Sequence, residues 1–198
     1  MTNRRQQQKE ATARRIFEAA ITLFTTQSYV ATTVEQIVRA AGVAKGTFFT
    51  HFASKDALLD HIGAIQMARI LAAIQADHAF AARSARARLQ LIVQALANGM
   101  EAQPSEMRAL TSEILIRRSL FDVDRQNISA LDQLIAQIIA EGQQRGELRA
   151  DAPAHRLATL ARGAYFLALF EWVDHPELAL APLAAQYLEL TLDGLSHR

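Results

Sequence analysis

Apolar residues recur at helical spacing along most of the chain, which predicts helices rather than strands. Between Ala11 and Gln27 the apolar positions 13, 17, 20, 21 and 24 form one stripe of an amphipathic helix. The same spacing predicts helices over Val34–Ala41, Ala44–His51 and Lys55–Asp77. Five further helices are expected over Arg86–Glu101, Ser105–Ser119, Asp124–Gln144, Ala154–Val173 and Pro182–Leu195. The sequence therefore predicts an all-α protein with about nine helices.

Signals for helix ends divide the first part of the chain into short helices. Thr32 stands three residues before Glu35, a spacing typical of a capping box that opens a helix. Gly42 follows the helix, where a positive φ is tolerated, and Ser54 precedes the fourth helix as a candidate cap. Residues 34–53 therefore have the dimensions of a helix-turn-helix.

The second helix of this pair carries two kinds of side chain. We expect Phe48, Phe49 and Phe52 to anchor it to the preceding helices. Short or hydrogen-bonding residues are expected to face outward, where they could enter a DNA major groove: Ala44, Lys45, Thr47, Thr50 and His51.

Composition and charge support a helical protein with one basic end. The chain has 38 Ala and only four Pro, with no Pro before Pro104, which favours helices. The net charge is +1, but residues 1–55 carry +5 and residues 56–198 carry −4. A basic module on an acidic body indicates one end that faces a polyanion.

The absence of other signals narrows the function. With no cysteine, the chain has no disulfide, thiolate nucleophile or Cys-ligated metal site. The first residues lack the apolar region of a signal peptide, and the longest apolar run, residues 163–170, is too short to span a bilayer. We therefore expect a cytoplasmic protein without a membrane partner. No cofactor is expected, because the sequence contains neither a phosphate-binding loop nor a dinucleotide fingerprint.

One stretch, residues 31–59, resembles a known family. Its marks are Thr32-Thr33-Val34, Ala41-Gly42-Val43, Lys45-Gly46-Thr47, His51-Phe52 and Ser54-Lys55-Asp56. Together they are similar to the amino-terminal domain of TetR-type (tetracycline-repressor-like) transcriptional regulators. The resemblance implies a tail and DNA-binding domain over residues 1–54 and a helical ligand-binding and dimerisation domain over residues 55–198.

The resemblance also implies roles for single residues. Thr33 and His51 would each contact a phosphate, and Lys45 and Thr47 would lie at bases or backbone. Lys55 and the amides that open the fourth helix would hold another phosphate. The family commonly has Tyr where Phe49 stands.

The body would provide a dimer interface and a ligand cavity. The resemblance favours a two-fold dimer built on the last two helices, whose candidate interface residues are Leu157, Leu160, Ala161, Ala164, Ala168, Leu183, Tyr187 and Leu188. Candidate pocket residues are Met67, Leu71, Asn98, Met107, Leu110, Ile114, Tyr165, Phe166 and Phe170. Both sets could instead form an ordinary internal core.

Several features have a plain alternative. Arg4, Arg5 and Lys9 fit a solvated, disordered tail, or an arm that lies in a minor groove. Glu171 and His175 are four residues apart, but a histidine at a helix end explains this spacing without a metal. We therefore expect no metal site.

The sequence supports one function above two alternatives. We expect a dimeric, ligand-responsive transcriptional regulator, a repressor that a small molecule releases from a palindromic double-stranded operator. The first alternative is a DNA-binding protein without sequence preference or ligand. The second is an all-α enzyme, for which the sequence offers no constellation of catalytic residues.

Overall fold

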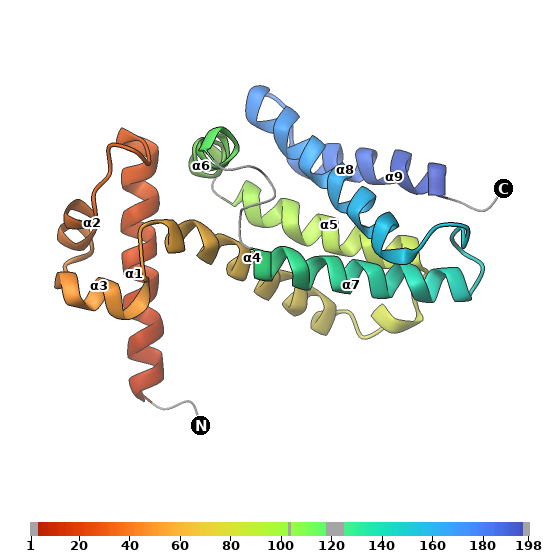
Figure 1. The fold of residues 1–198 in the computed structure, drawn as a ribbon, viewed down its shortest axis with the longest axis horizontal. Coiled ribbons are helices and arrows are strands. Elements are labelled where there is room, and N and C mark those ends of the chain that lie inside the picture. Colours follow the sequence, from red (N-terminus) through yellow and green to blue (C-terminus); the bar gives the residue numbers. More distant parts are fainter. Residues whose placement is uncertain (1–3, 103, 118–124, 196–198) are drawn as a thin grey trace. The chain divides into compact units, whose positions relative to one another are not determined.

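The fold is all-α, as the sequence predicts, in a computed structural model that describes residues 4–102, 104–117 and 125–195. Within these ranges the chain forms nine α-helices and one short 3-10 helix (Figure 1). They are α1 (Arg4–Gln27), α2 (Val34–Ala41), α3 (Lys45–His51), α4 (Asp56–Ala76), η1 (Phe80–Ala82), α5 (Ala85–Glu101), α6 (Pro104–Arg117), α7 (Arg125–Gln144), α8 (Ala154–Asp174) and α9 (Leu180–Leu195).

The chain divides into two compact units. The first comprises residues 1–62 and 105–123 and contains α1, α2, α3, the start of α4, and α6. The second comprises residues 63–104 and 124–198 and contains the remainder of α4 with η1, α5, α7, α8 and α9. The division falls inside α4, and the domain boundary expected after residue 54 stays a prediction.

The first unit is built on α1, which packs against both α2 and α3. The spacing of its apolar residues places Ile16, Ala20 and Phe24 on one face, and all three are buried. Ile37 of α2 and Phe48 of α3 are fully buried as well. Burial of each large side chain contributes about 1.5–3 kcal/mol, so two very short helices are held by packing rather than by helix propensity.

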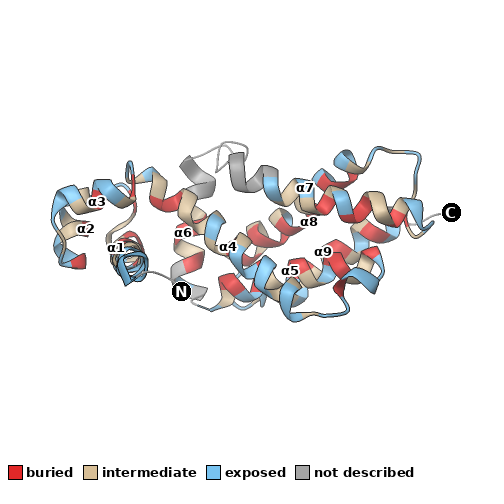
Figure 2. Cartoon of the chain, turned by 90° about the horizontal axis from the view of Figure 1, so that it is seen from below, coloured by how far each residue is buried: buried red, intermediate tan, exposed pale blue. Residues whose placement is uncertain are grey.

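The second unit is a bundle in which α8 packs against α7 and α9, and α5 packs against α7 and α9. Buried residues run along α5, α8 and α9 (Figure 2), and Trp172 of α8, which is 1% exposed, is among the largest fully buried side chains. Gly99 of α5 faces α4, and a Cβ built there would meet the ends of the Gln66 and Arg69 side chains, which would have to shift. The Arg69 guanidinium donates to the Gly99 carbonyl at 2.7 Å.

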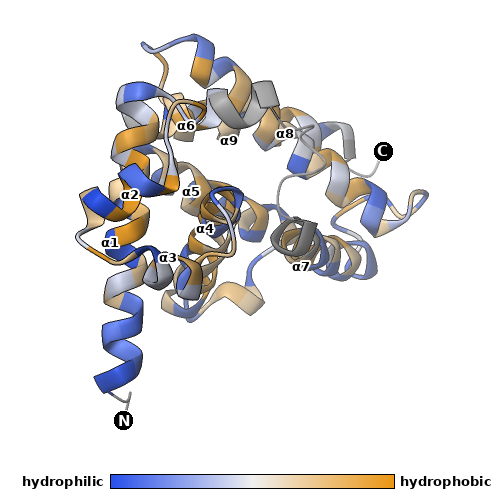
Figure 3. Cartoon of the chain, turned by 60° about the vertical axis from the view of Figure 1, so that its left-hand side comes forward, coloured by the Kyte–Doolittle hydropathy of each residue, from blue (hydrophilic) through white to orange (hydrophobic). Residues whose placement is uncertain are grey.

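Two expectations about local structure are wrong. The first turns of α1, which include Arg4, Arg5 and Lys9, are helical rather than a disordered tail. They are hydrophilic on all sides (Figure 3), so the apolar period that marks the rest of the helix is absent there. The helix α2 opens with Thr33 rather than Thr32, because the Thr33 hydroxyl accepts from the Gln36 amide.

The helix α4 has the length and apolar composition of a membrane-spanning helix, and it is the one described helix that meets both criteria. Only 22% of its most apolar window is buried inside the structure. One such helix is weak evidence for a membrane span, because helices of soluble proteins also meet these criteria.

Candidate nucleic-acid interface

The helix-turn-helix begins at a complete capping box. The Thr33 side chain accepts from the Gln36 backbone amide at 3.2 Å, and the Gln36 side chain accepts from the Thr33 amide at 2.8 Å. Gln27, the last residue of α1, donates to the same Gln36 side chain at 3.1 Å. The start of α2 is therefore fixed to the end of α1.

A left-handed glycine makes the turn between the two helices. Gly42 has a φ of 64°, as expected, and the Val43 amide donates to the Val38 carbonyl at 3.0 Å. Any other residue would be strained at this φ. The helix α3 then opens at Lys45, with Ala44 as its N-cap.

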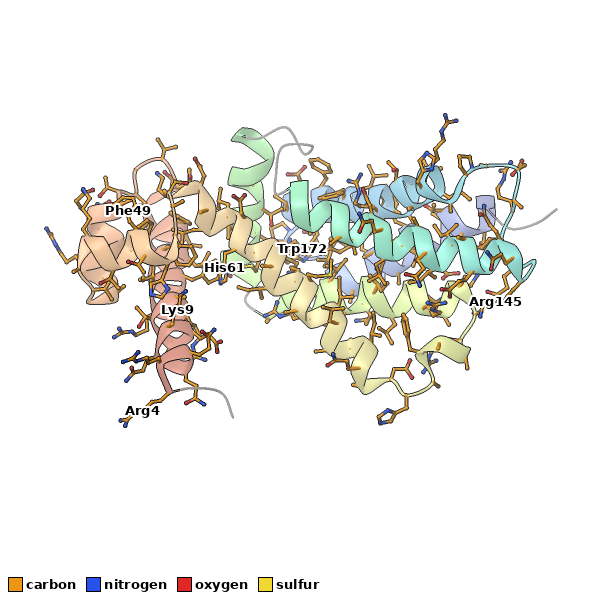
Figure 4. The ribbon with its side chains drawn as sticks, turned by 60° about the horizontal axis from the view of Figure 1, so that its bottom comes forward. Arg4, Lys9, Phe49, His61, Arg145 and Trp172 are labelled. Atoms are coloured by element: carbon orange, nitrogen blue, oxygen red, sulfur yellow. The ribbon has the colours of Figure 1, made fainter. Side chains whose placement is uncertain are left out.

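Two phenylalanines anchor α3, and the third does not. Phe48 is fully buried and Phe52 is 5% exposed, with ring centroids 5.9 Å apart. Phe52 also makes an edge contact with His61 of α4 at 5.4 Å. The expectation for Phe49 is wrong: its side chain is 48% exposed on the outer side of α3 (Figure 4). Phe48 and Phe52 are four residues apart and therefore share one face of the helix. Phe49 directly follows Phe48, so its side chain points in a different direction around the helix axis.

The outward residues expected from the sequence gather on the solvent side of α2 and α3. Thr33, Ala44, Lys45 and Thr50 are exposed, and Thr47 and His51 are half-buried. The Lys45 ammonium forms an ion pair with Glu35 of α2, and this pair holds the pKa of the Glu35 carboxyl below its usual value. The Thr50 hydroxyl donates to the Gly46 carbonyl at 2.9 Å. Their contacts with DNA stay predictions.

Lys55 has a structural role that sequence reasoning missed. Its ammonium donates to the carbonyls of Tyr29 at 2.6 Å and Thr32 at 2.8 Å, and it lies 4.1 Å from the centre of the Tyr29 ring. The Tyr29 hydroxyl donates to Asp56, the first residue of α4. Lys55 therefore joins the loop before α2 to the start of α4. No local sequence pattern indicates this contact, because the partners are 26 and 23 residues apart along the chain.

The candidate dimer residues fall into two groups. Leu157, Ala161, Ala164, Ala168 and Leu188 are buried within a single chain, so they have almost no surface to offer a partner. For these five the internal-core alternative describes the structure. The others lie on the outer side of α8 and α9, where Leu160 is 55% exposed and Leu183 and Tyr187 are half-buried. The Tyr187 hydroxyl joins the two helices by donating to Glu171 at 2.6 Å.

Two further leucines are exposed on these helices. Leu167 of α8 is 55% exposed and Leu190 of α9 is 64% exposed. Gly163 lies one turn of α8 before Leu167, and among the described residues nothing comes within 4 Å of a Cβ built on it. We call the surface of Leu160, Gly163, Leu167, Leu183, Tyr187 and Leu190 the α8–α9 face.

The candidate pocket residues are placed unevenly. Met107, Leu110 and Tyr165 are buried, and burial raises the pKa of the Tyr165 hydroxyl. Met67, Phe166 and Phe170 are half-buried, whereas Leu71 and Asn98 are exposed. The side chain of Ile114 lies outside the described part of the structure.

One buried polar side chain of α4 was not among the candidates. Gln66 is 8% exposed and its amide nitrogen lies 3.1 Å from the sulfur of Met100. In the described structure its side-chain oxygen lacks a hydrogen-bond partner. The sequence does contain a sign of this polar site, because a glutamine stands among the regularly spaced apolar residues of α4.

Near residue 175, the histidine and one carboxylate each contact a single neighbouring side chain. Glu171 accepts from Tyr187, and the His175 ring lies 3.3 Å from Glu177. Across the part of the chain that the structure describes, no three His, Asp or Glu side chains gather where they could hold a metal.

Comparison with known proteins agrees with this geometry. The family model described as "Bacterial regulatory proteins, tetR family" matches residues 16–62, which contain α2 and α3. The HTH-type transcriptional repressor KstR2 of Rhodococcus jostii is 24% identical over 91% of this chain and 89% of its own length. The fatty acid metabolism regulator protein of Bacillus subtilis is 23% identical over 96% of this chain and 99% of its own.

A solved structure agrees over nearly the whole chain. The TetR-family repressor FadR of Thermus thermophilus, determined in complex with lauroyl-CoA, is 28% identical with a TM-score of 0.67. The match covers 94% of this chain and 96% of that one. The capped α2, the glycine turn and the anchored α3 lie in the segment that the family model matches, and residues 16–62 carry the helix-turn-helix of the tetR family of bacterial regulatory proteins.

Proposed function

We propose that the protein is a dimeric repressor that binds a near-palindromic DNA operator through α3 and leaves it when a ligand with a long apolar chain binds the helical body. The observation that carries this proposal is the α2–α3 pair, which is packed on α1 and has an exposed outer side. Its core residues Phe48 and Phe52 are fixed, and its outward residues are free of the core. A helix must be held in this way if its outer side is to enter a major groove.

The DNA contacts divide into positioning and recognition. Thr33 and His51 would contact phosphates at the two ends of the motif, and Ala44, Lys45, Thr47 and Thr50 would meet the groove. Lys55 would contribute by fixing the loop before α2, in addition to any phosphate that it contacts.

Dimerisation would use the α8–α9 face. Three of its leucines are each more than half exposed, and together they would offer a partner more apolar surface than the single exposed leucines that are common on soluble proteins. Gly163 would let the partner helix approach closely. A two-fold dimer also answers a need of recognition, because one α3 contacts few base pairs. Two α3 helices would contact half-sites about 34 Å apart, or a multiple of that distance.

The ligand class is proposed from the relatives and from the second unit. One similar repressor binds lauroyl-CoA, and another relative is a regulator of fatty acid metabolism. An acyl chain would suit the apolar side chains of the body, and the unpaired Gln66 oxygen would give a polar group of the ligand a partner. Since α4 continues from the helix-turn-helix into the second unit, it would carry the change between them.

This mechanism requires a difference in affinity between two states. A ligand lowers operator binding only if it binds the released state more tightly than the bound state. A shift from 99% bound to 99% released needs a preference of about 10⁴-fold, or about 5.5 kcal/mol. With DNA as its target and no catalytic residue assigned, we propose a cytoplasmic regulator without enzyme activity.

The test measures operator binding with and without the ligand. A fluorescent duplex, selected by the protein from a random pool, is titrated with protein while fluorescence anisotropy reports binding. Lauroyl-CoA is expected to weaken binding at least tenfold, whereas coenzyme A alone is expected to leave it unchanged. Equal operator affinity at saturating lauroyl-CoA would refute this ligand class, and failure to bind any duplex would refute the DNA-binding function.

A further inference from the structure

The outer side of α3 is less polar than its sequence suggests. Lys45, Gly46, Phe49 and Thr50 are its most exposed residues, spaced so that they share one face of the helix. Lys45 and Thr50 are polar, but both have partners within the protein, so the groups that remain available on this face are largely apolar.

Thr50 presents its methyl group rather than its hydroxyl proton. The hydroxyl donates to the Gly46 carbonyl at 2.9 Å, so its one proton is already used. Donating to a guanine or thymine oxygen would break this bond. The methyl group and the oxygen lone pairs remain for a new contact, and the oxygen can then only accept, so Thr50 has nothing to donate to a base acceptor.

The positive charge on this face belongs to Lys45, which is paired with a residue of α2. The Lys45 ammonium pairs with the Glu35 carboxylate, and both side chains remain more than half exposed. An exposed pair of this kind is weak enough to exchange, so Lys45 can still reach a phosphate. In the free protein, however, its charge does not lie over Phe49.

Phe49 is the largest exposed group on the face. It is 48% exposed, while Phe48 beside it is fully buried with its ring centroid 5.3 Å away. Gly46 stands three residues before it, and in the described structure nothing lies within 4 Å of a Cβ built at Gly46. The missing side chain leaves the Phe49 ring uncovered and lets a groove approach the helix backbone.

From these contacts we infer that α3 recognises thymine, through contacts of Phe49 and the Thr50 methyl with thymine 5-methyl groups. The 5-methyl of thymine is the apolar group that base edges present in the major groove. A ring and a methyl group without a free proton complement it better than they complement the guanine edge, which offers two acceptors. Phe49 and Thr50 thus determine specificity for thymine at two neighbouring positions of each half-site. This inference rests on the proposed function.

The experiment replaces thymine by deoxyuridine, which removes the methyl group and keeps the base pair. Each thymine of the selected duplex is replaced in turn, at both symmetric positions, and affinity is measured by anisotropy. Losing one buried methyl should weaken binding about fourfold per half-site, and about fifteenfold for the symmetric pair. The effect should be confined to the thymines beneath α3.

Variants assign the methyl contacts to their residues. Phe49→Ala should bind thymine and uridine duplexes equally at one position, because its partner group is gone. Thr50→Ser keeps the hydroxyl and should lose uridine sensitivity at the other position, whereas Thr50→Val keeps the methyl and should retain it. Val30→Ala is the matched control, since Val30 is 55% exposed and lies outside α3. Circular dichroism checks the fold of each variant.

The outcomes separate this inference from the proposed function. If a specific duplex is selected but every uridine replacement leaves affinity unchanged, thymine recognition is wrong and DNA binding stands. The same holds if uridine sensitivity persists in both Phe49→Ala and Thr50→Ser. If the random pool yields no enriched sequence, the proposed function itself fails.

Discussion

Replacing Leu167 by alanine should weaken the proposed dimer. Leu167 is 55% exposed in the single chain, and full burial of a leucine contributes about 2 kcal/mol. Covering its exposed half would therefore contribute about 1 kcal/mol in each chain. A two-fold axis uses the residue twice, so the variant should lose about 2 kcal/mol, or roughly 30-fold in the dimer Kd.

Sedimentation equilibrium across a range of protein concentrations measures this change directly. Leu71→Ala is the matched control, because Leu71 is a leucine of α4 that is 48% exposed and does not belong to the α8–α9 face. Its dimer Kd should equal that of the unchanged protein. An unchanged Kd for Leu167→Ala, or an equal loss for Leu71→Ala, would refute the assignment of the interface.

Three further changes test the first unit. Glu35→Gln removes the anion that pairs with Lys45, so affinity for random DNA should rise and its salt dependence should steepen; equal salt slopes would contradict this. Lys55→Met removes two charged hydrogen bonds and should lower the free energy of unfolding in urea by about 2 kcal/mol, whereas a pure phosphate contact would leave stability unchanged. Burial lowers the pKa of His61 below 6.5, so the unfolded chain binds more protons and stability should fall as pH drops below 6.5. His61→Phe should flatten this loss in thermal unfolding, and an unchanged pH profile would contradict it.

The helices could be predicted because their apolar periods and end signals are local. Gly42 ends α2 and Ser54 caps α4 through its contact with the Ala57 amide, as the sequence indicates. The sequence predicts the cap of α2 one position too early, because Thr32 and Thr33 are both competent caps. The polar first turns of α1 carry no period that could have indicated a helix.

The orientation of side chains was harder to predict than the helices. Phe48 and Phe49 are identical neighbours, and only the packed structure distinguishes the buried ring from the exposed one. In α8 apolar residues occur on every side, so its sequence cannot separate Leu157, which faces the core, from Leu160, which faces outward. The contacts of Lys55 depend on chain segments that folding brings together, which no local pattern encodes.

Selection of duplexes from a random pool by the purified protein tests the central claim most directly. The claim is that two copies of α3, related by a two-fold axis, recognise DNA. It predicts enrichment of one near-palindrome whose thymine-containing half-sites are separated by about one helical turn or a multiple of it. Enrichment of a single half-site without a symmetric partner would contradict the dimer, and binding without enrichment of any sequence would contradict specific recognition by α3.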